Sequence, residues 1–186
     1  MSLTENINNF HSDDVIFGGI DGIVSTFAII CGCFGSGQTA LTALVLAASN
    51  LIADGFSMGV SSYTSKLEED YKGDAFNSGV AKYLAFVLIG LIPVSWFILV
   101  FAVFRSKTRK SLLTKNDIMM VVILSITGLG LVGLFKGCYR NKKQNKNNDK
   151  NLRNKILCEN IIKTILIGSG AGILAYLTAH LISSSV

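Results

Sequence analysis

The chain has little charge for its length. Charged residues make up 16% of its 186 positions, whereas hydrophobic residues make up 50% and the mean hydropathy is +0.50. A soluble domain of this size carries about 25% charged residues. The apolar residues form several long runs, which is typical of a protein that crosses the membrane several times. We therefore expect one compact membrane domain and no separate soluble domain.

Other absences exclude further classes. Positions 1–14 contain no Lys or Arg and no short apolar core before a cleavage site, so we expect no cleaved secretory signal. The four cysteines lack the paired spacing of a zinc site and are interpreted as small packing residues. No phosphate-binding loop and no Ser/His/Asp set occurs, so we expect neither an enzyme nor a bound cofactor. The net charge of +5 lies mainly between the apolar runs, which argues against a nucleic-acid partner.

The apolar runs predict an all-α polytopic membrane protein. A run of about 20 residues crosses a hydrocarbon core of about 30 Å as a helix, and only a helix satisfies its own backbone there. The five predicted transmembrane helices are 15–35, 40–64, 79–104, 117–137 and 159–183. Residues 1–14 are expected to be a cytosolic N-terminal segment, and residues 15–186 a single domain. The only proline, Pro93, predicts a kink in the third helix.

The placement of basic residues predicts the orientation. If the N-terminus is cytosolic, eleven Lys and Arg residues lie on the cytosolic side and five on the opposite side. The eleven are Lys66, Lys72, Lys82, Lys136, Arg140, Lys142, Lys143, Lys146, Lys150, Arg153 and Lys155. The five are Arg105, Lys107, Arg109, Lys110 and Lys115. Because cytosolic loops are enriched in basic residues, we expect the N-terminus in the cytosol and the C-terminus on the opposite side.

Two carboxylates interrupt the hydrophobic spans. Asp21 lies in the first span and Asp54 in the second. A charged side chain at mid-bilayer costs about 2.5–3.5 kcal/mol even on the lenient insertion scale, and such residues usually face a pathway, a partner or an ion. Residues four apart share a helix face, which predicts two polar stripes. One consists of Asp14, Gly18, Asp21 and Ser25, and the other of Asn50, Asp54 and Met58.

Two such stripes facing each other would supply carboxylate oxygen and thioether sulfur along one path. Carboxylates bind hard and borderline divalent cations, whereas a thioether shifts the preference toward softer transition metals and away from Mg²⁺ and Ca²⁺. Fe²⁺ and Mn²⁺ fit this mixture, and the absence of a closed cage suits an ion that must be released. Other interpretations stay open, because Asp54 could be a buried structural carboxylate and Met58 a packing residue.

Small residues recur four apart in three of the spans. The pairs are Gly18 and Gly22, Gly55 and Gly59, and Gly168 and Gly172. This spacing lets helices approach closely. It supports tight packing and is compatible with a dimer, but specifies neither.

The motifs resemble those of the vacuolar iron transporter family. Asp14–Ala28 is similar to its first-helix motif and Asn50–Tyr63 to its second. Leu84–Pro93, Leu131–Gly137 and Glu159–Tyr176 resemble parts of the third, fourth and fifth helices, so the similarity covers nearly all of residues 12–183.

The resemblance implies a five-helix protomer that forms a homodimer with the ion path between the subunits. It also implies that Fe²⁺, and often Mn²⁺, leaves the cytosol in exchange for protons. The host membrane is expected to be a vacuolar or other intracellular storage membrane in a eukaryote, and the cell membrane otherwise. Matched by motif, Asp21 and Met58 are the path-lining carboxylate and thioether, and Asp14 is a carboxylate at the cytosolic entrance.

Two features depart from the family pattern. Many members carry a long, Glu-rich cytosolic metal-binding domain between the second and third helices, whereas this connection is about a dozen residues long, so the chain resembles the short form. A second-helix acid of some members aligns with Asn50, and Asp54 lies one turn further on. The carboxylate's role could have moved to Asp54.

These observations give the hypothesis of a homodimeric divalent-metal exporter. Asp14 gathers the ion, Asp21 binds it and exchanges a proton, and Met58 supplies a soft ligand, with Asn50 and Asp54 as further candidate ligands. The rival hypothesis is a membrane scaffold or metal sensor with the same fold that transports nothing. A transporter of another cation or a small solute would be indifferent to Met58.

Overall fold

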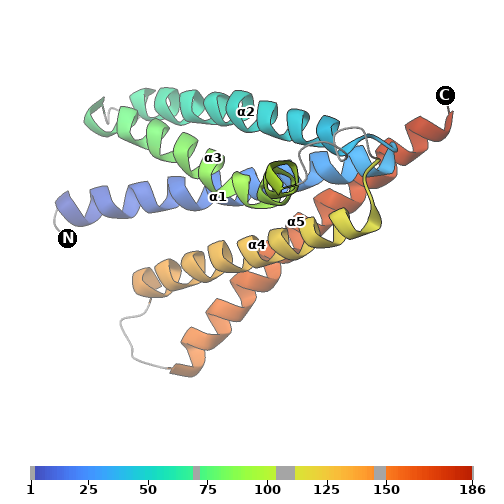
Figure 1. The fold of residues 1–186 in the computed structure, drawn as a ribbon. Helices are drawn as coiled ribbons and strands as arrows, with labels where there is room; N and C mark the ends of the chain where they lie inside the picture. The colour runs from blue at the N-terminus through green and yellow to red at the C-terminus, as the bar shows by residue number, and fades with distance from the viewer. Residues whose placement is uncertain (1–2, 69–71, 104–111, 145–149, 186) are drawn as a thin grey trace.

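The chain forms a bundle of five long α-helices (Figure 1). The computed structural model describes residues 3–68, 72–103, 112–144 and 150–185, with side chains for 13–68, 74–102, 112–139 and 157–185. The helices are α1 (Leu3–Gly35), α2 (Ala40–Glu68), α3 (Lys72–Val103), α4 (Lys115–Gln144) and α5 (Lys150–Ser185). Each contains a stretch long and apolar enough to cross a membrane. The predicted fold class is therefore confirmed, and each predicted span falls on a different helix.

The helix ends differ from the sequence prediction mainly on one side of the bundle. Helix α1 begins at Leu3, so most of the predicted N-terminal segment 1–14 is part of the first helix. Helix α2 continues to Glu68, α4 to Gln144, and α5 begins at Lys150. These polar extensions all lie at the end where α1 begins (Figure 1). Hydropathy does not detect them, because it marks only the apolar part of a helix.

The connection between α1 and α2 is a tight turn that makes the two helices antiparallel neighbours, as its glycines predict. Gly37 has a φ of 67°, a left-handed conformation that glycine adopts without strain. The Gln38 amide donates to the Cys33 carbonyl at 2.8 Å, and the Thr39 hydroxyl accepts from the Thr42 amide at 3.2 Å. The turn thus closes α1 and caps α2 within five residues.

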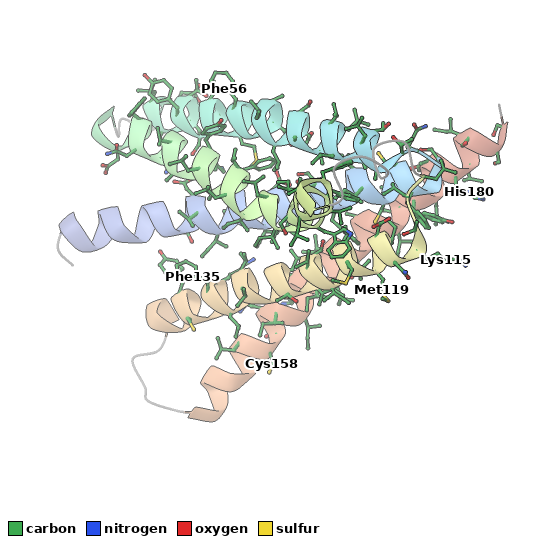
Figure 2. All side chains as sticks on the ribbon, viewed as in Figure 1. Phe56, Lys115, Met119, Phe135, Cys158 and His180 are labelled. Carbon is green, nitrogen blue, oxygen red and sulfur yellow. The ribbon has the colours of Figure 1, made fainter. Side chains whose placement is uncertain are left out.

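Helix α1 is the centre of the bundle. Among the residues that the structure describes, it is the only helix that packs against all four others, and its most extensive contact is with α3. Half of the α1 span is buried, against 11% of the α5 span. The outer faces carry large apolar side chains such as Phe56 on α2 (Figure 2), Leu88 and Leu166. Faces of this kind suit contact with lipid.

Two glycines of α1 allow its backbone to touch that of α3. A Cβ added at Gly18 would lie 2.5 Å from the Lys82 carbonyl oxygen, and one at Gly22 would lie 2.3 Å from that of Phe86. Neither backbone atom can move aside as a side chain would. Helix α3 continues through Pro93, and its last turns run in a different direction from its first (Figure 1), as the proline predicts.

We expect Gly22→Ala to destabilise the bundle, because the new methyl group must push α1 away from α3. Overpacking of this kind costs about 1–3 kcal/mol. Gly130→Ala is the matched control, since nothing lies within 4 Å of its added Cβ. Thermal unfolding of the purified proteins in detergent should show a lower midpoint for Gly22→Ala and an unchanged or higher one for Gly130→Ala. Equal midpoints would contradict the backbone contact.

Candidate functional site

A group of buried polar side chains from α1, α2 and α3 lies at the end where α1 begins. Because α1, α3 and α5 run opposite to α2 and α4, the first turns of one set meet the last turns of the other (Figure 1). Figure 2 shows Cys158 at this end and Lys115 and His180 at the opposite end. Cys31 and Cys33 are buried within the bundle, whereas Cys138 and Cys158 are exposed, so the packing interpretation of the cysteines holds only for the first pair.

Asp14 lies in a buried polar cluster with side chains of α2 and α3. Lys66 Nζ donates to Asp14 Oδ2 at 2.5 Å, and Ser78 Oγ donates to the same oxygen at 2.5 Å. Ser62 Oγ donates to Asp14 Oδ1 at 3.1 Å, and Lys66 also donates to Ser78 Oγ. Lys82 Nζ lies 4.0 Å from Asp14 Oδ1. We call these five residues the Asp14 cluster.

The cluster satisfies a charge that would otherwise be costly to bury. The side chains of Asp14 and Lys66 are each 10% exposed. A buried carboxylate is tolerated when an opposite charge and hydrogen-bond donors surround it, and here both oxygens accept from protein donors. The cluster also joins α1, α2 and α3. The sequence predicts Asp14 as a carboxylate that gathers ions, and the structure places Lys66 on that carboxylate.

Asp21 and Met58 line one cavity of about 470 Å³. They come from α1 and α2, and Asp21 is exposed while Met58 is half-buried. The wall also includes Lys82 of α3, Lys136 of α4 and Lys163 of α5. Phe17, Ile20, Asn160, Thr164 and Ile167 complete it. The carboxylate of the first predicted stripe and the thioether of the second therefore line the same cavity, together with three ammonium groups.

Lys82 connects the cavity to the Asp14 cluster. Its ammonium is within ion-pair distance of Asp14 and it lines the cavity beside Asp21. The charges of Lys82 and Asp54 both act on the Asp21 carboxylate. The two carboxylates of the predicted α1 stripe thus share one lysine, although Asp14 is buried and Asp21 is open.

The two remaining candidate ligands lie on α2 outside the cavity wall. Asp54 is half-buried, and the Nδ2 atom of Asn50 is buried without a hydrogen-bond partner. A buried polar group left unpaired costs about 1–3 kcal/mol. Among the side chains that the structure describes, no three His, Cys, Asp or Glu residues come together as a metal site. The described part of the chain thus offers separate ligands along α1 and α2 rather than a cage.

Sequence reasoning missed the residues that hold Asp14. Lys66 and Lys82 contributed only to the charge count of the loops, and Ser62 and Ser78 had no role. A signal was present, because Ser62 and Lys66 are four apart on α2, and Ser78 and Lys82 are four apart on α3. Each pair puts a hydroxyl and an ammonium on one face of a helix end.

Comparison with known proteins finds similarity to vacuolar iron transporters. The model described as the VIT family matches residues 12–71, which include all five candidate ligands. The vacuolar iron transporter of Plasmodium berghei (strain Anka) is 22% identical, over 94% of this chain and 83% of the relative. That of Plasmodium falciparum (isolate 3D7) is 23% identical, over 74% of each chain. That of Toxoplasma gondii (strain ATCC 50861 / VEG) is 44% identical, over 35% of this chain and 22% of the relative.

The chain is thus similar in sequence to vacuolar iron transporters. The alignment with the Plasmodium berghei transporter spans 245 positions, more than the 186 residues of this chain, so that relative contains segments without a counterpart here. The segment that the family model matches runs from within α1 through the turn and α2. These elements contribute Asp14, Asp21, Met58 and Lys66.

The two α1 carboxylates should differ in their effect on stability. Asp14→Asn removes the buried carboxylate that Lys66 contacts at 2.5 Å, and breaking a buried pair costs about 3–5 kcal/mol. Asp21→Asn alters an exposed side chain, for which changes within about 0.5 kcal/mol are usual. Thermal unfolding in metal-free detergent solution should therefore show a large loss for Asp14→Asn and almost none for Asp21→Asn. The reverse order would contradict the assignment of buried and open carboxylates.

Proposed function

We propose that this protein moves Fe²⁺, and also Mn²⁺, out of the cytosol across an intracellular storage membrane in exchange for protons. In this proposal two copies pair and the ion moves between them. The N-terminus and the cavity end of the bundle face the cytosol, in agreement with the excess of basic residues at that end. The names of the relatives support iron as the transported metal.

The observation that carries the proposal is the shared cavity of Asp21 and Met58. A carboxylate oxygen and a thioether sulfur together favour a transition metal over Mg²⁺ or Ca²⁺. The side chain of Asp21 is exposed and that of Met58 half-buried, so an incoming ion can reach the pair. A few weak ligands also suit release on the far side better than a closed cage does.

The charges of the cavity favour a second copy. Within one protomer the Asp21 carboxylate faces Lys82, Lys136 and Lys163 across the same space. A divalent cation in such a cavity would meet more positive than negative charge. A partner that brings its own Asp21 and Met58 would double the oxygen and sulfur ligands around one ion. The exposed apolar faces of the bundle leave room for such a partner as well as for lipid.

Proton exchange follows from the chemistry of the carboxylate. A metal ion and a proton compete for the same negative charge, so Asp21 can hold one or the other but not both. Binding metal on one side then requires that the proton leaves, and release on the other side lets a proton return. Asp21 is therefore the residue that couples the two fluxes.

Asp21→Asn should abolish metal-driven transport. Purified protein is reconstituted in liposomes that contain a metal-quenched dye and a pH dye, and Fe²⁺ or Mn²⁺ is added outside under anaerobic conditions. We expect metal entry with opposite proton movement for the wild type, and neither flux above the background of protein-free liposomes for Asp21→Asn. Met58→Leu keeps the packing volume and should reduce Fe²⁺ flux without abolishing it.

Asp13→Asn is the matched control, because Asp13 is an exposed carboxylate of the same helix that lies outside the cavity wall. It should keep wild-type flux. Normal transport by Asp21→Asn would refute the coupling role of this carboxylate. Folded wild-type protein that moves neither metal would favour the rival function of a membrane scaffold or sensor.

A further inference from the structure

Lys66 is the least expected member of the Asp14 cluster. It lies in the last turn of α2, and only 8% of the residue is exposed. A lysine near a helix end in a membrane protein ordinarily extends its long side chain toward the aqueous interface. Here the side chain points inward instead and places its ammonium on Asp14 Oδ2 and Ser78 Oγ. The pair joins two residues that are 52 positions apart.

We propose that Lys66 is a built-in competitor for the transported cation. Its ammonium occupies Asp14 while no metal is bound, and a divalent ion reaches Asp14 only by displacing it. This inference rests on the proposed function, because it assigns Asp14 to the route of the ion. It makes Lys66 a positioning residue that sets how much metal is needed before Asp14 is filled.

Electrostatics requires the exchange. An ammonium 2.5 Å from a carboxylate oxygen leaves no space for a metal ion at that oxygen. A divalent cation and an ammonium placed at the same carboxylate would also repel each other strongly in a site with little water. Lysine suits such an exchange because it is a compact charge on a flexible stem, which can swing away without moving the helix.

The cluster without the ammonium is a set of oxygen atoms that can receive a cation. Ser62 Oγ and Ser78 Oγ lie 3.1 and 2.5 Å from the Asp14 carboxylate, and 2.9 Å from each other. A hydroxyl oxygen has two lone pairs and can turn its hydrogen away from a bound cation. Asp14, Ser62 and Ser78 would then offer three hard ligands, in contrast to the oxygen and sulfur pair of Asp21 and Met58.

Displacement of the Lys66 ammonium from Asp14 would also affect the cavity around Asp21, through Lys82. Lys82 is 4.0 Å from Asp14 and lines the wall beside Asp21. A cation that replaces Lys66 at Asp14 changes the charge that Lys82 faces, and Lys82 in turn acts on Asp21. A cation bound at Asp14 thereby changes the electrostatic environment of Asp21 without direct contact between the two carboxylates.

Mn²⁺ binding to purified full-length protein in detergent tests the competition. The loss of the hexaaquo Mn²⁺ signal in electron paramagnetic resonance gives the dissociation constant. We expect Lys66→Gln to bind Mn²⁺ about tenfold more tightly than wild type, a difference of about 1.4 kcal/mol. Mn²⁺ should also raise its unfolding temperature more than that of wild type, because the ion replaces the missing counter-charge. The gain should vanish in Asp14→Asn/Lys66→Gln.

Lys115→Gln is the charge-matched control. Lys115 is exposed and lies at the opposite end of the bundle (Figure 2), so its removal should leave Mn²⁺ affinity unchanged. Should Lys66→Gln fail to fold, Lys66→Arg carries the test. Arginine stays charged and can bind a carboxylate through two parallel hydrogen bonds. It should therefore hold Asp14 more firmly and weaken Mn²⁺ binding, and tighter binding would refute the competition.

The results separate this inference from the proposed function. If the wild type transports metal, but folded Lys66→Gln binds Mn²⁺ no more tightly than the wild type does, only the competitor role is wrong. A gain in affinity that persists without Asp14 overturns it as well. If neither wild type nor Lys66→Gln binds Mn²⁺ or moves it into liposomes, both the competitor role and the transport function are wrong.

Discussion

The contact between the backbones of α1 and α3 is the constraint on which the polar end of the bundle depends. Gly18 and Gly22 let the two helices approach until a single methyl group would collide with the Lys82 or Phe86 carbonyl. That proximity brings Ser78 within hydrogen-bond distance of Asp14 and Lys82 within ion-pair distance. It also leaves Asp21, one stripe position beyond Gly18, at the cavity that α2, α4 and α5 complete.

The two carboxylates of α1, Asp14 and Asp21, therefore lie in different environments. Asp14 is covered by α2 and α3 and is neutralised by Lys66 and two hydroxyl groups. Asp21 is exposed and lines a cavity with Lys82 of α3, Lys136 of α4 and Lys163 of α5. A charge inside a membrane costs free energy. The open carboxylate, Asp21, is therefore the stronger functional candidate. The buried one, Asp14, must first lose its contact with Lys66. Our proposals for Asp21 and Lys66 follow from this difference.

The sequence predicts much of this arrangement because some features need no knowledge of packing. Hydropathy locates all five helices, and the spacing of Gly18 and Gly22 predicts a close approach. The helical period predicts that Asp21 and Met58 belong to polar stripes, and their shared cavity brings those stripes together. The environment of Asp14 could not be predicted, because its hydrogen-bond partners on α2 and α3 are 48 to 64 positions away. Which face of each helix end turns inward depends on the packing of three helices.

The most direct test of the account is the location of the metal itself. Crystals of the protein soaked anaerobically in Fe²⁺, with data collected at the iron absorption edge, would show each bound ion as an anomalous peak. The account predicts a peak within coordination distance of the Asp21 carboxylate and the Met58 sulfur, which is absent from crystals of Asp21→Asn. Iron bound only outside this cavity, or unchanged by the loss of Asp21, would contradict it.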